Sequence, residues 1–372
     1  MSETTGRAAV LETFNAPFEI REYPVPTPEP GAILARIELA TVCGSDLHIW
    51  ENDLGGTYTL PLPLVLGHEM VGVVEALGEG AERDAMGVEL AVGDRIVWAN
   101  EPCHRCPTCN VEHELTLCPN RRLISLTKCS TPPHFVGTFA DYGYVAPGQG
   151  RLRVPDGVKS EWASAASCAL RTVVNTVEAA GRIDYLDTVV VQGAGPLGLF
   201  ATALLATHRP EKLIVVGAPD DRLRLARDWG ATHTIGIAEH PTAESRLEAI
   251  RAITADGPSV ALELSGARGA AAEGINMLRP RGRYVITGTV GGGDQPLDVS
   301  RITTRGLRIT GSMSGDIDAY WKALRFLDAH QDRFDWDRMI GNRYGLHQAV
   351  EAMESMRRMD EIKPVLVPAL TV

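Results

Sequence analysis

The sequence contains no long apolar run, and its positive charges are outnumbered. No run of apolar residues approaches the roughly 18 that a membrane-spanning helix needs, so a membrane is not expected as a partner. Lysine and arginine total 36 against 47 aspartates and glutamates, which gives a net charge of −11. Because nucleic acids and anionic membranes attract positive proteins, this balance disfavours both partners and favours a small-molecule substrate.

The first ten residues also lack the basic and then apolar order of a secretory signal, which indicates the cytoplasm. Thiols stay reduced there, so disulfides are not expected. Four of the seven cysteines nevertheless crowd into sixteen positions, namely Cys103, Cys106, Cys109 and Cys118. In a reducing compartment such crowding predicts a metal site.

The composition is that of a folded protein, and the length suggests two domains. Hydrophobic residues make up 44% and charged residues 22% of the 372 residues, so disorder is disfavoured. The first 160 residues contain short β-like runs broken by Gly and Pro. Ile33, Ala35, Ile37 and Leu39 alternate with Arg36 and Glu38, and the run 95–98 follows a Gly-Asp turn. This part is predicted to be β-rich.

The texture changes after about residue 167, where short apolar runs alternate with helical patterns. The runs predicted as strands are Thr188–Gln192, Leu213–Gly217, Thr234–Ile237, Ser259–Leu264, Arg283–Gly288 and Leu307–Gly311. Helices are predicted between them, for example where Leu247, Ile250 and Ile253 recur at helical spacing. Six such strands with helices between them predict a doubly wound parallel sheet, covered on both faces.

The last sixty residues contain two more helical patterns and then a short strand at 364–367. We expect this tail to pack back on the first domain. The glycine run 291–293 is predicted to be a loop, and no fixed-period repeat or long linker is present.

A glycine-rich phrase with a strand on one side and an apolar helix on the other is typical of dinucleotide binding. It runs Gly193, Ala194, Gly195, Pro196, Leu197 and Gly198. Gly193 permits the tight turn, Gly195 lets the backbone approach a pyrophosphate, and Gly198 lets helix and strand pack closely. The helix N-terminus then offers free N–H groups to the anion.

The acidic residue that usually binds the cofactor ribose is missing. Its expected place, at the end of the second predicted strand, holds Gly217. This absence removes a feature that favours NAD, yet Asp220 and Asp221 would repel the phosphate of NADP. Arg222 could serve either cofactor or simply face solvent. The residues therefore leave NAD and NADP both open, with NAD the weakly preferred choice.

The spacing Cys-x2-Cys-x2-Cys-x8-Cys from Cys103 to Cys118 is typical of a four-thiolate tetrahedral site, for which Zn2+ is the expected ion. With four cysteines no position stays open for water, so this zinc is predicted to be structural. A second group is spread along the chain as Cys43, His68 and Cys168. Three such ligands plus an open position suit a catalytic zinc, but buried cysteines and a core histidine would fit the spacing as well.

Three segments resemble the zinc-dependent alcohol dehydrogenases of the medium-chain dehydrogenase/reductase family. They are CGSDLH at 43–48, GHEMVG at 67–72 and Cys168-x3-Thr172, and the similarity extends to IKPVL at 362–366. The resemblance implies that Cys43, His68 and Cys168 hold the catalytic zinc. The sorbitol-type branch uses a Glu as its third ligand, and the pattern at Cys168 points away from it.

The resemblance also assigns roles to residues around the zinc. It implies that Glu69 lies beside the zinc and ligates it transiently, that Asp46 is a supporting partner, and that Ser45 and His48 form a proton relay to solvent. Thr172 matches a residue that touches the nicotinamide. The family's four-cysteine lobe has a last interval that is usually one residue shorter, so this lobe is expected to be reshaped around its last cysteine.

The family implies a GroES-like, β-rich catalytic domain with an inserted Rossmann domain. The expected bounds are 1–167 with 313–372 for the catalytic domain, including the zinc lobe at about 100–120, and 168–312 for the cofactor domain. The implied activity is hydride transfer between an alcohol, or its aldehyde or ketone, and NAD or NADP. Two zinc ions per chain and a homodimer or homotetramer are expected.

The sequence is compatible with two other functions. One is an NADPH-dependent carbonyl reductase of the same fold, which the missing acid at Gly217 permits. The other is a non-catalytic, zinc-stabilised cofactor-binding protein, which the net charge and the complete ligand set disfavour. The substrate is not readable from the sequence. Arg171, beside Cys168, is a candidate to hold a carboxylate or phosphate on the substrate.

Overall fold

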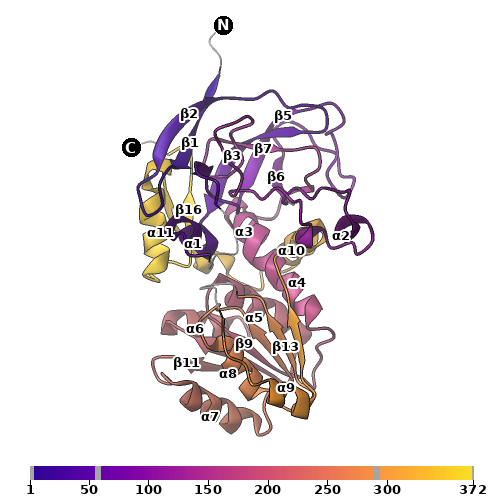
Figure 1. Ribbon diagram of the computed structural model, residues 1–372, viewed down its shortest axis with the longest axis vertical. Helices are drawn as coiled ribbons and strands as arrows, with labels where there is room; N and C mark the ends of the chain where they lie inside the picture. Colours follow the sequence, from indigo (N-terminus) through magenta and orange to yellow (C-terminus); the bar gives the residue numbers. More distant parts are fainter. Residues whose placement is uncertain (1–3, 55–59, 289–293, 371–372) are drawn as a thin grey trace. The chain divides into compact units, whose positions relative to one another are not determined.

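A computed structural model of the chain describes residues 4–54, 60–288 and 294–370 (Figure 1). The glycine run 291–293, predicted to be a loop, lies outside these residues. The chain folds into two compact units. Unit 1 contains the described parts of 1–53, 58–171 and 315–372, and unit 2 contains Leu54 and the described parts of 172–314.

Unit 1 is built mainly of antiparallel strands. Its strands are β1 (Thr5–Leu11), β2 (Glu19–Pro24), β3 (Ile33–Thr41), β4 (Leu64–Val65), β5 (Val71–Leu77), β6 (Arg95–Trp98), β7 (Tyr142–Val145), β8 (Arg151–Arg153), β15 (Ile340–Tyr344) and β16 (Lys363–Leu366). One sheet has the order β2-β1-β4 and the other β15-β16-β3-β5-β6-β8, with β7 paired to β3. The predicted β-rich domain is confirmed.

Strand β3 is the centre of unit 1, and its sequence shows why. Ile33, Ala35 and Ile37 point into a core that also contains Trp98, while Arg36 is exposed. This alternation is the period of two expected of a strand with one buried face. Strand β3 pairs with β5 and β7, and β16 pairs with Ala40 and Thr41 at the end of β3, so the backbone is held in place two residues before Cys43.

The chain's end returns to its beginning, as the sequence predicts. Strand β16 pairs antiparallel with β3, with Val365 opposite Thr41. Helix α11 (Ala349–Arg357) contacts α1 (Gly44–Glu51), and Figure 1 shows the yellow C-terminal segment beside the indigo N-terminal one. The unit's other helices are α2 (Pro107–Asn110), α3 (Ser160–Ala165), α10 (Ile317–Ala329) and the short helical turns η1 (Leu115–Leu117), η2 (Ala166–Leu170), η3 (Trp336–Met339) and η4 (Leu346–Gln348).

Unit 2 is built on a six-stranded sheet whose neighbouring strands run parallel. The strands are β9 (Thr188–Gln192), β10 (Lys212–Gly217), β11 (His233–Gly236), β12 (Val260–Glu263), β13 (Arg283–Ile286) and β14 (Arg308–Gly311), in the order β11-β10-β9-β12-β13-β14. All six predicted strands are present, and the doubly wound fold is confirmed. No helix in the described residues is long and apolar enough to cross a membrane.

Helices alternate with these strands. They are α5 (Pro196–His208), α6 (Asp220–Asp228), α7 (Ala243–Thr254), α8 (Ala270–Met277) and α9 (Val299–Arg305), and α4 (Arg171–Ala179) precedes β9. The predicted apolar stripe of α7 packs on the core, with Ile250 fully buried. The strand order reverses between β9 and β12, and ligands of such folds bind at the carboxyl ends of the strands at this point.

Candidate metal and cofactor sites

Four side chains from distant parts of unit 1 meet at one place. The ligand atoms of Cys43, His68, Glu69 and Cys168 all lie within 4.8 Å of one another. Cys43 is the N-cap of α1, directly after β3. His68 and Glu69 lie between β4 and β5, and Cys168 lies in the π-helical turn η2. The structure therefore brings together the three predicted zinc ligands and the predicted transient ligand.

A buried carboxylate orients two of these residues. Asp46 has no exposed surface and accepts hydrogen bonds from the backbone N–H groups of Cys43 (2.9 Å) and Gly67 (3.2 Å). It also lies 3.2 Å from Nδ1 of His68. Burial alone would lower the pKa of His68, but Asp46 raises it well above its usual value. With Nδ1 engaged, Nε2 is the ring nitrogen left for a metal, as is common for metal-binding histidines.

The two cysteines of this cluster interact with each other. A hydrogen bond with Cys168, together with burial, raises the pKa of Cys43 to about 11, while the same contact lowers the pKa of Cys168. The turn that holds Cys168 is a π-helix, a rare geometry that often occurs at functional sites. Two thiolates and an imidazole are the donors that zinc prefers, so the cluster fits a zinc ion.

Glu69 belongs to a buried polar network that was not predicted from the sequence. Its carboxylate accepts hydrogen bonds from Nζ of Lys363, at 2.5 and 2.6 Å, and from the hydroxyl of Thr41 at 2.5 Å. Lys363 is only 1% exposed. Burial opposes its charge, but Glu69 outweighs burial and raises the pKa of Lys363 above its usual value. The one signal of this network in the sequence is Lys363 itself, a lysine at the start of the final apolar strand.

The predicted relay residues both lie on α1. Ser45 is exposed, and its hydroxyl is 3.8 Å from the sulfur of Cys43. His48 lies three positions later, on the same helix face. Its Nδ1 is 4.0 Å from Asp53 and has no hydrogen-bond partner within the described residues. The structure thus brings Ser45 to the cluster and leaves a ring nitrogen of His48 available.

Arg171 is engaged within the fold. It is buried, its Nε donates to the carbonyl of Ser167 (2.6 Å), and its Nη1 donates to the carbonyl of Gly315 (3.1 Å). Its guanidinium also lies 4.9 Å from the ring centre of Tyr320. These contacts give Arg171 a structural role in joining η2 to the segment before α10, which does not require the substrate contact considered from the sequence.

The four cysteines of the predicted structural site also come together. The ligand atoms of Cys103, Cys106, Cys109 and Cys118 lie within 4.8 Å of one another, with Cys106 at 3.4 Å from Cys109 and 3.9 Å from Cys118. A tetrahedral zinc with Zn–S bonds of about 2.3 Å separates its sulfurs by roughly 3.8 Å, so the group fits zinc. The 3-10 turn η1 lies within the eight-residue interval, and Cys118 is fully buried.

The thiols of this lobe are already unequal in acidity. A hydrogen bond from the backbone N–H of Arg105 and contacts with neighbouring groups lower the pKa of Cys103 to about 6. Burial and the neighbouring thiols raise the pKa of Cys109 to about 12. Such crowding of thiols favours an ion that can hold all four as thiolates.

In unit 2 the glycine-rich turn has the predicted geometry. Gly193 has φ of +115°, and a Cβ on Gly198 would lie 1.9 Å from the carbonyl oxygen of Gly193. Both positions therefore require glycine. A Cβ on Gly195 would meet nothing within 4 Å, and α5 begins at the next residue, Pro196, without a side-chain cap. Open space at a helix N-terminus fits a pyrophosphate.

The missing acid at Gly217 has a packing reason. A Cβ there would lie 2.6 Å from the Cβ and 2.7 Å from the backbone nitrogen of Ala194, inside the glycine-rich turn. Any side chain at Gly217 would displace that turn. Arg222 is buried in the first turn of α6, and burial lowers its pKa, so it does not simply face solvent.

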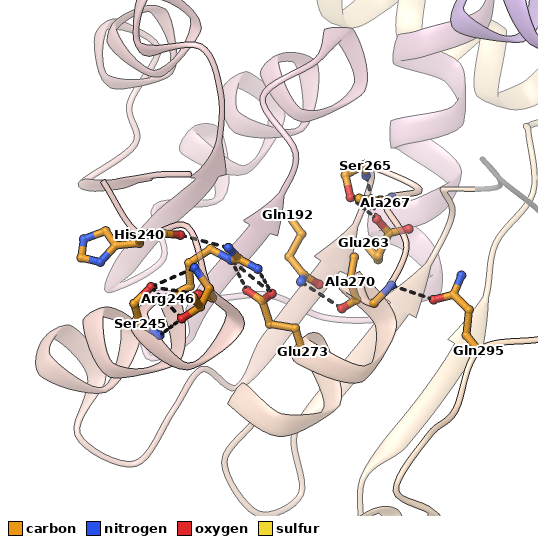
Figure 2. Close-up of polar contacts among 12 residues, drawn as sticks. Gln192, His240, Ser245, Arg246, Glu263, Ser265, Ala267, Ala270, Glu273 and Gln295 are labelled. Atoms are coloured by element: carbon orange, nitrogen blue, oxygen red, sulfur yellow. Dashed lines mark hydrogen bonds and ion pairs between the residues drawn. The ribbon is translucent and has the colours of Figure 1, made fainter. Parts of the chain in front are cut away.

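The carboxyl end of β12 contains a feature that was not predicted from the sequence. Glu263 is buried and accepts hydrogen bonds from the backbone N–H and the hydroxyl of Ser265 and from the N–H of Gly266 (Figure 2). The backbone of Ser265 packs against Gly193. The signal of this feature in the sequence is an acidic residue, Glu263, at the end of the otherwise apolar run 260–263. This carboxylate fixes the turn that lies beside the glycine-rich turn.

Nearby side chains join the same edge. Gln192, at the end of β9, donates to the carbonyl of Ala270 (3.0 Å), and Figure 2 shows this contact beside the ion pair of Arg246 with Glu273.

Thr172, the predicted nicotinamide contact, is buried. It lies in α4, and its carbonyl accepts a hydrogen bond from the hydroxyl of Thr176.

Two family models match the chain, and their descriptions agree with the two units. Residues 29–156 match the alcohol dehydrogenase GroES-like domain, and residues 196–329 match the zinc-binding dehydrogenase domain. A 5-exo-hydroxycamphor dehydrogenase from Pseudomonas putida is 35% identical, with 97% of this chain and 98% of that protein aligned. A sorbitol dehydrogenase from Bacillus subtilis is 30% identical over 94% of this chain and 92% of its own length.

Solved structures give the same result. An alcohol dehydrogenase from Thermotoga maritima superposes with a TM-score of 0.90 at 31% identity, covering 98% of this chain and 99% of its own. A zinc-binding dehydrogenase from Sinorhizobium meliloti, bound to NADP, has a TM-score of 0.84 at 27% identity, with 98% and 100% covered. Zinc binding and a nicotinamide cofactor are therefore indicated both by these proteins and by the cysteine-containing clusters and glycine-rich turn described above.

Proposed function

Because this chain belongs to the zinc-dependent alcohol dehydrogenases of the medium-chain dehydrogenase/reductase family, we propose that it oxidises secondary alcohols with NAD at a zinc ion bound by Cys43, His68 and Cys168. Hydride transfer between an alcohol, or its carbonyl product, and a nicotinamide cofactor is the activity of this family. The observation that supports the ligand assignment best is the meeting of these three donors with Asp46 behind His68.

Zinc bound there would supply a Lewis acid that stabilises negative charge on the substrate oxygen, and the nicotinamide would accept the hydride. The chain's own groups then move the proton. Ser45, beside Cys43, accepts the proton of the substrate hydroxyl while it gives up its own hydroxyl proton. His48, three positions later on the same helix, is the general base that takes up the released proton and passes it to solvent. Asp46 keeps the ring of His68 in one orientation.

Glu69 is assigned as a reserve ligand. Its carboxylate is within reach of the other donors but is already bound by Lys363 and Thr41. Leaving Lys363 unpaired in the core would be costly. We therefore assign Glu69 only a transient role at the metal, in steps where the contact with Lys363 lengthens.

The second zinc is assigned to the four-cysteine lobe. Its ligands are Cys103, Cys106, Cys109 and Cys118, whose sulfurs leave no ligand position for a substrate. This zinc has a structural role, and the expected content is two zinc ions per chain. Thiol ligands of this kind need a reducing compartment, which is consistent with the cytoplasm.

The cofactor assignment rests on unit 2. The glycine-rich turn from Gly193 to Gly198 would take the pyrophosphate, and Thr172 would contact the nicotinamide. NAD is preferred over NADP because Asp220 and Asp221, in the first turn of α6, would repel a 2′-phosphate. Reduction of carbonyls with NADPH is the second candidate, which buried Arg222 beside these acids supports.

The names of the relatives support a proposal for the substrate class. Relatives that match over most of this chain include dehydrogenases or reductases named for hydroxycamphor, sorbitol, xylulose and threonine at carbon 3. Hydroxycamphor, xylulose and carbon 3 of threonine each present a secondary alcohol or the matching ketone. Secondary alcohols are therefore the proposed substrates of this chain.

A substrate panel tests this proposal. Zinc-loaded protein is mixed with cyclic and acyclic secondary alcohols and with matched primary alcohols, each with NAD and with NADP, and reduced cofactor is followed by absorbance. Faster turnover of secondary alcohols with NAD is expected. Turnover confined to carbonyl reduction with NADPH would replace the proposal by the second candidate, and no turnover of any substrate by protein with two zincs would overturn both.

A further inference from the structure

Unit 2 also contains a charged hollow, at the end of the sheet opposite the glycine-rich turn. A hollow of about 570 Å³ is lined by Arg182, Asp184, Asp187, Arg281, Arg283, Gly306 and Arg308. Arg283 and Arg308 are the first residues of β13 and β14, and Asp187 immediately precedes β9. Because these strands are parallel, the hollow lies at their amino ends, whereas the glycine-rich turn follows the carboxyl end of β9.

The carboxylates of this hollow are already in use. Asp187 accepts hydrogen bonds from the hydroxyl of Ser259 (2.7 Å) and from Nη2 of Arg283 (3.3 Å). Asp184 pairs with the largely exposed Arg182 at 3.3 Å and accepts from the backbone N–H of Leu186. Four arginines thus face two acids, and both acids are engaged.

The remaining two arginines have no counter-charge. Arg281 and Arg308 are exposed, and neither makes a side-chain hydrogen bond or ion pair within the described residues. Arg308 stands directly opposite Arg283 in the register of β13 and β14. Like charges opposite each other on neighbouring strands are destabilising. The fold therefore keeps an uncompensated positive charge at this point.

The backbone holds these two arginines in place. Arg281 has φ of +62°, and its N–H donates to the carbonyl of Arg305 at 2.8 Å. The N–H of Arg308 donates to the carbonyl of Gly282 at 3.0 Å. The turn before β13 and the turn before β14 are therefore tied together, so the spacing of the two side chains does not depend on a flexible loop.

More positive charge lies close to the hollow along the chain, because Arg305 immediately precedes Gly306 of its lining. Burial lowers the pKa of Arg301, and the nearby charges of Arg305 and Arg251 lower it further. Nε of Arg305 is buried and has no hydrogen-bond partner within the described residues. This local excess contrasts with the net charge of −11 for the whole chain.

We propose that this hollow is a second anion site, distinct from the cofactor site, which binds a small molecule carrying two or more phosphate groups through Arg281 and Arg308. Guanidinium groups bind phosphate oxygens through paired hydrogen bonds. The volume lies within the range of about 300–1,000 Å³ of ligand sites. A compact polyphosphate would neutralise Arg308 and Arg281 together and remove the repulsion along the edge.

Calorimetric titration with inorganic pyrophosphate tests this proposal. The zinc-loaded enzyme is first saturated with NAD, so that the glycine-rich turn is filled. One pyrophosphate per chain is expected to bind at low salt. Arg281→Gln with Arg308→Gln is expected to weaken binding about a hundredfold, since each charge-assisted contact contributes about tenfold or more. Both side chains are exposed, so the variant should keep wild-type zinc content and turnover.

The matched control is Arg36→Gln with Arg83→Gln, which removes the same charge from exposed positions of unit 1. Its pyrophosphate affinity should stay within twofold of wild type, and its zinc content, measured after titration, shows whether chelation occurs. Three results would overturn the proposal. These are no pyrophosphate binding to the NAD-saturated enzyme, equal affinity in wild type and the Arg281/Arg308 variant, or a change of subunit assembly in that variant with pyrophosphate affinity retained.

Discussion

The two cysteine-containing clusters of unit 1 are assembled in different ways. The four-cysteine lobe takes all its donors from sixteen consecutive residues, a stretch that contains the short helix α2 and turn η1. The other cluster takes Cys43 from the end of β3, His68 from the loop before β5, and Cys168 from a π-turn a hundred positions later. The first is a local feature of the chain, and the second exists only when the domain has folded.

The groups that surround the two clusters also differ. The lobe's sulfurs mainly contact one another and nearby backbone, so its chemistry is closed. The distant cluster has acid and base partners, with Asp46 behind His68 and Lys363 behind Glu69. A closed thiolate group suits stability, while an unequal ligand set with charged neighbours suits catalysis. Variants at the two clusters should therefore separate these two roles.

The largest effect is expected at the distant cluster. Cys43→Ser or His68→Ala should reduce the zinc content from two to one and lower turnover by about a thousandfold or more, because the Lewis acid supplies several kcal/mol. Thermal stability should change little in comparison. Zinc analysis and turnover of the same preparation provide the measurement, and a variant that keeps both zincs and full activity would refute the ligand assignment.

Cys118→Ser should show the opposite pattern. It removes one donor of the four-cysteine lobe, so one zinc should be lost and the melting temperature should fall by roughly 10 °C, as expected for a loss of a few kcal/mol. The turnover of the protein that stays folded should be retained in large part. Two retained zincs together with an unchanged melting temperature would show that the lobe does not bind metal.

Lys363→Met tests whether the distant cluster depends on its buried ion pair. Removing one partner of a buried pair costs about 3–5 kcal/mol, because Glu69 would remain without its counter-charge. Adding Glu69→Gln should recover much of that loss, which unfolding by urea can measure as a double-mutant cycle. Lys159→Met, which breaks an exposed pair with Asp337, is the control and should leave stability nearly unchanged. Equal losses in the two lysine variants would contradict this role for Lys363.

Local patterns in the sequence were sufficient to predict most of the fold. The strands of unit 2 were predicted because each is a short apolar run between helical patterns, and their ends differ by no more than two residues from those observed. Likewise the alternation in 33–39 predicted β3. Such signals depend on neighbours along the chain, so no knowledge of the folded core was required.

The contacts that could not be predicted are those between distant residues. Lys363 meets Glu69 only because β16 returns to pair with β3. The sequence predicts that the tail packs on the first domain, but nothing near either residue indicates this particular pairing. The packing of Gly217 against Ala194 is of the same kind. The missing carboxylate was visible, but its steric cause was not. A Gly217→Asp variant would therefore disturb binding of both cofactors instead of selecting between them.

The relay adds a smaller effect within the distant cluster. His48→Gln should keep both zincs and slow alcohol oxidation about tenfold or more, because a positioned base contributes about 10²–10⁴-fold and buffer can replace part of that. The loss should be greatest at low pH, with partial rescue by added imidazole. Ser45→Ala should lower turnover at every pH without such rescue. The same pH–rate profile in His48→Gln and wild type would remove His48 from the relay.

The smallest effect concerns the tail that carries Lys363. Glu361, two residues earlier, accepts hydrogen bonds from Tyr344, Ser355 and Asn342. Burial would raise the pKa of Glu361, but these donors outweigh burial and lower it below its usual value. A carboxyl whose pKa is lowered by folding stabilises the protein above its unfolded pKa, near 4.5, and this contribution is lost as the pH falls through the lower folded value.

Glu361→Gln should therefore be less stable than wild type at pH 7, and the gap should narrow below about pH 4. Because the carboxylate is partly exposed, the difference is expected to be about 1 kcal/mol or less. Urea unfolding of both proteins at each pH measures the gap directly, and comparing them cancels the loss of zinc that acid causes in either. Strand β16 also brings Lys363 to Glu69. The Glu361→Gln change should therefore weaken zinc binding at the distant cluster before it affects the four-cysteine lobe. A gap that widens in acid would show that Glu361 is not stabilised as a carboxylate.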